Sequence, residues 1–146
     1  MMNATLENLI EKASDFHGHL GPFLVIGVRM GLIGLRELEL KKGAEKLQVR
    51  ALLKYSVPFS CVLDGIQVTT GCTLGNQKLT LENSLGIAAE FLLPNKKQVT
   101  VTVNQTTFNR LKNKLLSEKI PDHEIQELAQ LMVSIPEKDL FIVRRE

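Results

Sequence analysis

The first forty residues carry two different patterns of apolar positions. In the first, apolar residues recur three and four positions apart between Leu6 and Ala13, which predicts an amphipathic helix that ends before Gly18. In the second, residues 22–40 are apolar almost all round until Arg36. A helix that is apolar on nearly every side is buried. The sequence therefore predicts a long buried helix near the N-terminus.

Alternating apolar and polar residues after this helix predict strands. The segment 47–53 alternates in this way, and so do residues 99–103 after a turn at 94–97. The other expected elements are a helix over 61–70 that Ser60 caps and Gly71 ends, strands over 78–82 and 86–93, a helix through Phe108, Leu111 and Leu115, another from Pro121, and a closing strand over 140–143. This order predicts a single α+β domain over residues 1–146, with a mainly antiparallel sheet flanked by helices.

Three glycines share one face of the long apolar helix. Gly27, Gly31 and Gly34 are spaced by four and three, and each costs about 1 kcal/mol of helix propensity relative to alanine. Such a face favours the close approach of another backbone. The sequence predicts a homodimer with this glycine face near the contact, and a strand of the same chain is the alternative partner.

Composition and charge exclude several classes of protein. The chain has 146 residues, 44% of them hydrophobic and 23% charged, with a net charge of +2. These values are ordinary for a globular protein and indicate neither disorder nor a nucleic-acid-binding surface. The longest apolar run contains Arg29 and is shorter than the ~20 residues of a membrane span. With two cysteines and no signal peptide, we expect a cytoplasmic protein without membrane contact.

Two histidines stand between the first two expected helices. His17 and His19 flank Gly18, and side chains two apart in an extended segment point to the same side. The pair can therefore face one metal ion, since neutral imidazole is a common metal ligand. The alternative is that both histidines cap helix ends or form hydrogen bonds within the fold.

Cys61 stands at the start of an expected helix. The positive end of a helix dipole lowers the pKa of a thiol, which suits a nucleophile or a metal ligand. The alternative is a small buried apolar side chain. Asp64 and Gln67 follow on or near the same helix face, and with Thr70 they are candidates to line a cofactor pocket.

The segment 69–75, Thr-Thr-Gly-Cys-Thr-Leu-Gly, combines two glycines with three hydroxyls. Backbone N–H groups in such a loop can bind an anion. The segment lacks the lysine and the spacing of a P-loop, and a glycine-terminated helix followed by a turn explains it equally well.

Two separated blocks resemble one known family. The segment 16–22, Phe-His-Gly-His-Leu-Gly-Pro, with the apolar helix after it, resembles the opening of the FmdE-like family, which is named after a component of formylmethanofuran dehydrogenase. The segment 61–76, from Cys61 to Asn76, resembles the second block of that family, and the closing strand extends the resemblance over nearly the whole chain.

The resemblance implies an α+β core, a dimer, and a divalent transition metal, zinc in particular, held by His17, His19, Cys61 and Cys72. Gly21 stands where many relatives have cysteine, and the chain ends without the C-terminal zinc ribbon that many relatives carry. A continuous helix over 61–71 would place Cys61 and Cys72 ~16 Å apart. Either that helix is broken, or a second subunit completes the site, or Cys61 alone joins the histidines, which is the arrangement we favour.

Three functions follow from these residues. The first is a metal-binding protein whose pocket acts on an unknown small molecule, with Cys61 as a candidate catalytic residue. The second is a non-enzymatic subunit or metal carrier for a molybdenum or tungsten oxidoreductase, related to methanogenesis through the family name. The third is a metal-free thiol protein in which Cys61 is the nucleophile and a histidine is the base.

Overall fold

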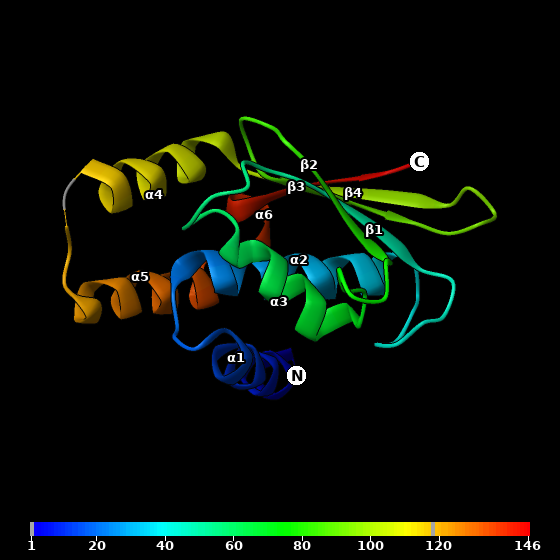
Figure 1. Ribbon diagram of the computed structural model, residues 1–146, viewed down its shortest axis with the longest axis horizontal. Coiled ribbons are helices and arrows are strands. Elements are labelled where there is room, and N and C mark those ends of the chain that lie inside the picture. Colours follow the sequence, from blue (N-terminus) through cyan, green and yellow to red (C-terminus); the bar gives the residue numbers. More distant parts are fainter. Residues whose placement is uncertain (1, 118) are drawn as a thin grey trace.

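The computed structural model describes residues 2–117 and 119–146 (Figure 1). It contains the helices α1 (Met2–His17), α2 (Pro22–Glu37), α3 (Cys61–Thr70), α4 (Gln105–Ser117), α5 (Asp122–Ser134) and α6 (Glu137–Leu140). Its strands are β1 (Gln48–Leu52), β2 (Leu79–Glu82), β3 (Ala88–Leu92), β4 (Gln98–Val103) and β5 (Phe141–Arg145). The expected elements are therefore present, and the short α6 is an addition to them.

The five strands form one sheet in the order β2-β1-β3-β4-β5. Only β1 and β2 pair in parallel, and α3 is part of the connection between them. The three other pairs are antiparallel, which confirms the predicted α+β class with a mainly antiparallel sheet. The register places Val49 opposite Phe91 and Phe91 opposite Val99, and all three side chains are buried. The intervening residues form the more exposed face, where Arg50 pairs with Glu90.

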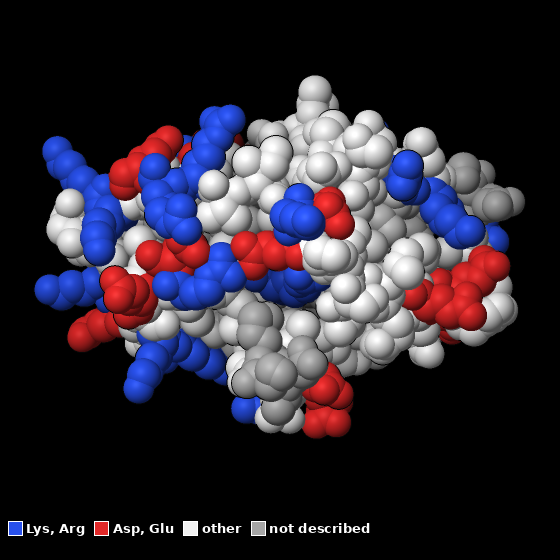
Figure 2. All heavy atoms as spheres, turned by 180° about the vertical axis from the view of Figure 1, so that it is seen from behind, with Lys and Arg blue, Asp and Glu red and all other residues white. Residues whose placement is uncertain are grey.

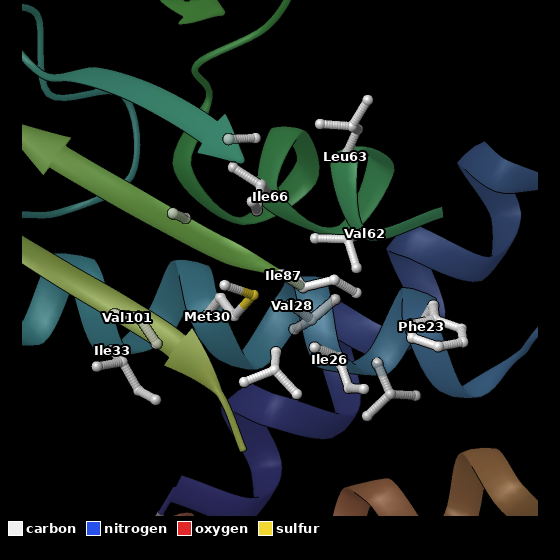
Figure 3. Packing of buried hydrophobic residues seen from close by; sticks show 14 of the residues in the cluster. Phe23, Ile26, Val28, Met30, Ile33, Val62, Leu63, Ile66, Ile87 and Val101 are labelled. Carbon is white, nitrogen blue, oxygen red and sulfur yellow. The ribbon is translucent and has the colours of Figure 1, made fainter. Parts of the chain in front are cut away.

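The helices are layered on the sheet. Figure 1 shows α2 and α3 against one face of the sheet and α1 on the far side of these two helices. In α2, residues 22–31 are all buried. Figure 3 shows Val28 and Met30 of α2 meeting Val62 and Ile66 of α3 in this core. The layered packing explains why α2 is apolar on nearly every side, because it has neighbours on most sides.

The glycine face of α2 packs within the chain, so the expectation of a dimer contact at this face is wrong. A Cβ atom at Gly27 would overlap the carbonyl oxygen of Val62, and one at Gly34 would overlap the ring of Phe91. A Cβ at Gly31 would lie 2.8 Å from Cβ of Thr69. The glycines therefore allow α3 and β3 of the same chain to approach α2 closely.

Arg29 is the buried cation of α2. Its Nη1 donates to the carbonyl oxygens of Met132, at 2.8 Å, and Ile135, at 2.7 Å. These carbonyls belong to the C-terminal end of α5, where backbone acceptors lack partners within the helix. Burial lowers the pKa of the Arg29 guanidinium, and Glu137 opposes that effect. Arg29 thus fixes α5 against α2.

The ends of α3 differ from the expectation in one respect. Gly71 ends the helix with a left-handed φ of 79°, as predicted. Ser60 has helical backbone angles and makes no capping hydrogen bond through its side chain. The first amides of α3 donate instead to the preceding turn, from Cys61 to Pro58 and from Val62 to Phe59.

Charged side chains of both signs are interspersed on the face shown in Figure 2. Several form pairs, such as Arg36 with Glu137 and Arg145 with Glu37. In the described part of the chain, we find no helix with the length and apolar character needed to span a membrane.

Candidate metal and ligand site

A cavity of about 320 Å³ lies where the end of α1 and the starts of α2 and α3 come together. α4 and α5 contribute Leu115 and Ile125 to its wall. His17, His19 and Cys61 are the lining residues that carry a nitrogen or sulfur atom in the side chain, and the other lining side chains are apolar. The structure therefore brings three of the candidate residues to one cavity.

Gly18 places the two histidines side by side. His17 is the last residue of α1, and the amide of Gly18 donates to the carbonyl of Ser14. Gly18 has a φ of 105°, which a residue with a side chain rarely adopts. The chain turns there, and the ring centroids of His17 and His19 lie 4.7 Å apart. A helix end and a glycine turn, rather than an extended segment, bring the two rings together.

His17 is held by a chain of hydrogen bonds from α3. Its Nδ1 lies 2.5 Å from Oδ2 of Asp64, and Oδ1 of Asp64 accepts from Nε2 of Gln67 at 3.0 Å. Oε1 of Gln67 accepts in turn from the amide of Leu74 at 3.0 Å. A carboxylate beside Nδ1 favours the tautomer with the proton on that nitrogen. The lone pair of Nε2 is then available to a ligand.

The other ring nitrogen of His17 has no partner. Nε2 is buried and makes no hydrogen bond within the described residues. A buried polar atom without a partner is costly and calls for an explanation. Metal-bound histidines commonly donate their second ring nitrogen to a carboxylate, as His17 does to Asp64. In this respect the residues fit a metal ion.

The donor set is not assembled as a closed metal site. Within residues 2–117 and 119–146, no three side chains of His, Cys, Asp or Glu lie close enough to form a metal-binding group. His17, His19 and Cys61 share the cavity wall without converging on one point. Since His19 is exposed and its ring is on a loop, a change of side-chain rotamers is the smallest movement that would bring it closer to Nε2 of His17.

Cys61 is a buried thiol, 7% exposed, on the wall of the cavity. Burial and the negative charge of Asp64 raise its pKa to about 11. The expected lowering of this pKa by the helix start is therefore wrong. The physical reason is that loss of water and a nearby carboxylate outweigh the helix end, whose first amides already donate to the preceding turn.

We expect Cys61 to react slowly with iodoacetamide in the metal-free protein at neutral pH. A pKa of about 11 reduces the thiolate fraction about a hundredfold relative to an ordinary thiol. The alkylation rate should rise with pH until it approaches that pKa. Mass spectrometry of the wild type and of Cys61→Ser, which retains Cys72, measures it. A Cys61 rate at neutral pH equal to that of a free thiol would contradict this assignment.

The structure places Cys72 and Thr70 outside the cavity. α3 is continuous from Cys61 to Thr70, so the two cysteines stand at opposite ends of it. The thiol of Cys72 is buried against the carbonyl of Leu47, and the hydroxyl of Thr70 donates to the carbonyl of Ile66. Asp64 and Gln67 are also absent from the cavity wall and act on it through His17.

The loop after α3 uses its amides internally. The amide of Cys72 donates to Oγ1 of Thr70, that of Thr73 to Oδ1 of Asn76, and that of Leu74 to Gln67. These N–H groups are therefore engaged by the protein itself. The arrangement supports the interpretation of 69–75 as a helix end and turn.

Sequence reasoning missed the cavity wall on the side of α4 and α5. Leu115, Leu116 and Ile125 come from helices more than forty residues beyond α3 in the chain. Their apolar spacing predicted helices and gave no signal of which face would meet the histidines. Only the docking of these helices puts them beside His17.

The fold and the sequence both place the chain among known proteins. It matches, with a TM-score of 0.64 and 22% identity, the crystal structure of an FmdE-like protein of tungsten formylmethanofuran dehydrogenase from Syntrophus aciditrophicus. The match covers 97% of this chain and 71% of that one and shows a shared fold. Residues 16–142 match the family model described as "FmdE, Molybdenum formylmethanofuran dehydrogenase operon". The chain belongs to the FmdE family, as its two sequence blocks predicted.

One curated relative is similar over part of its length. It is a probable S-adenosyl-L-methionine-binding protein from Archaeoglobus fulgidus, 40% identical over 74 residues. The aligned segment covers 51% of this chain and 20% of that protein. The chain therefore corresponds to a small portion of that relative.

Proposed function

We propose that the chain is a metal-binding protein whose site is built on Nε2 of His17, with zinc as the preferred ion. The observation that carries the proposal is a buried imidazole nitrogen without a hydrogen-bond partner, on a ring that Asp64 holds in the matching tautomer. His19 and Cys61 on the same cavity wall supply the further donors. Mixed imidazole and thiolate ligands suit zinc.

The proposed ligand set leaves chemistry to the cavity. Two histidines and one cysteine would leave one position of a tetrahedral ion open, as in catalytic rather than structural zinc sites. A zinc ion held there would polarise a carbonyl or lower the pKa of a bound water. Asp64 and Gln67 would orient His17, and the apolar wall would limit the access of bulk water.

Zinc stoichiometry tests the proposal. Protein purified without chelator or metal-affinity tag should carry about one zinc per chain. His17→Ala and Cys61→Ala should each lower the occupancy severalfold, because each removes a donor. His123→Ala, which removes an exposed histidine outside this cavity, is the matched control and should retain zinc. Full occupancy in both site variants, measured by elemental analysis, would refute the proposal.

The raised pKa of the Cys61 thiol weighs against the metal-free thiol protein. The family description, which refers to the operon of a molybdenum enzyme, favours a second candidate function. In that case the chain would be a component or metal carrier for a molybdenum or tungsten oxidoreductase in the cytoplasm. Purification from the native cell tests this role, since such a chain should be recovered with a larger enzyme.

We also propose that the chain forms a homodimer. The glycine face of α2 is unavailable for this contact, but apolar side chains are exposed beside the cavity, where Val57 is 77% and Leu116 is 53% exposed. Pairing two copies through this surface would remove these side chains from water. Sedimentation equilibrium should show twice the chain mass of 16.3 kDa, and Leu116→Lys should lower it. A wild type that remains a monomer would contradict the proposal.

A further inference from the structure

The cavity wall is chemically one-sided. Its side-chain heteroatoms belong to His17, His19 and Cys61, and no lysine, arginine, aspartate or glutamate lies among the lining residues. The rest of the wall is hydrocarbon, from residues such as Leu24, Val57 and Ile125. A molecule that fills this cavity must therefore be mostly apolar and place its polar group at the histidines and the cysteine.

The size and charge of the cavity limit the molecule further. A volume of about 320 Å³ is at the small end of the ~300–1,000 Å³ that is usual for ligand pockets. A phosphate ester carries up to two negative charges and is normally bound by arginine, lysine or several backbone amides. No cationic side chain in the wall would balance that charge, and burying an unpaired charge is costly.

The start of α2 favours a head group with a single negative charge. Gly21, Pro22 and Phe23 line the cavity, and Gly21 makes no capping hydrogen bond through its side chain. The first amides of a helix and its dipole stabilise an anion nearby. This helix start supports the inference only together with the unpartnered Nε2 of His17 in the same cavity.

We propose that the cavity binds a small, mainly apolar thiol, whose thiolate occupies the open position of the metal and whose body lies against the apolar wall. The inference rests on the proposed zinc site. A thiolate matches the soft character of a zinc ion that already has a cysteine ligand. On binding, the thiol loses its proton to the solvent and its sulfur bonds to zinc, with no oxidant or reductant required.

Three probes with the same aromatic body test the head group. Benzyl mercaptan, benzyl alcohol and benzyl phosphate would be titrated by calorimetry into zinc-loaded protein and into protein stripped by chelator. The thiol should bind the zinc-loaded protein at least about tenfold more tightly than either other probe, and more tightly than it binds the stripped protein. Zinc content measured after each titration shows that the thiol has not extracted the ion.

Two tryptophan variants on α5 test the position. Ile125→Trp fills the cavity and should weaken thiol binding at least about tenfold without changing the zinc content. Leu131→Trp, at an exposed position of the same helix outside the cavity, is the matched control and should bind as the wild type does. Equal weakening by both variants would overturn the placement.

The outcomes separate this inference from the proposed function. If zinc binds but the thiol does not, or if the alcohol or the phosphate binds as tightly, the ligand class is wrong and the zinc site stands. If the protein carries no zinc that depends on His17 and Cys61, the proposed function fails, and this inference fails with it.

Discussion

Gly27→Ala is expected to destabilise the protein by at least about 3 kcal/mol, a large part of the ~5–15 kcal/mol that a domain has. The added Cβ would overlap the carbonyl oxygen of Val62, a backbone atom that cannot rotate away. α2 and α3 would have to separate. That movement would also disturb the reciprocal contact, in which a Cβ at Gly65 would lie 2.5 Å from the carbonyl oxygen of Leu24.

Urea unfolding followed by circular dichroism measures this loss of stability. Gly75→Ala is the matched control, because its Cβ would meet only Oγ1 of Thr73, at 3.7 Å, on the exposed surface. The control should remain within about 0.5 kcal/mol of the wild type. A Gly27→Ala protein as stable as this control would show that α2 and α3 do not pack as closely as described.

Asp64→Asn is expected to weaken zinc binding about 10–100-fold. The carboxylate now accepts from Nδ1 of His17 and from Nε2 of Gln67. In the asparagine variant, the amide oxygen can still accept from Gln67, which turns the amide nitrogen toward His17. An N–H facing Nδ1 stabilises the tautomer with the proton on Nε2, and that nitrogen can then no longer bind a metal.

Competition with a chromogenic zinc chelator measures the affinity, and nitrogen NMR of the histidine ring reports the tautomer. Asp15→Asn, which removes an exposed carboxylate from α1, is the control for the change in net charge. A purely structural role of Asp64 would change the thermal stability and leave the ring tautomer as it is. Unchanged zinc affinity in Asp64→Asn would show that the carboxylate does not position His17.

The local pattern of residues was sufficient for the elements of the fold. The apolar stretch from Pro22 predicted a buried helix that begins at that residue, and Gly71 predicted the end of α3. Alternation predicted β1 and β4. These features depend on helical and strand periodicity and on the backbone preferences of proline and glycine, which operate within a few residues. The same local reasoning gave the pairing of His17 with Cys61 only as one of several arrangements.

Tertiary structure decided what each of these features contacts. The glycines of α2 indicated a close neighbour, but only the docked helices show that the neighbour is α3 of the same chain. The helix start at Cys61 predicted a low pKa, and burial beside Asp64 reversed that direction. Asp64 is 47 residues from His17 and holds its ring. The sequence by itself determined which residue types stand at the site; the folding of distant segments determined their burial, partners and charge, because desolvation and hydrogen bonding depend on three-dimensional proximity.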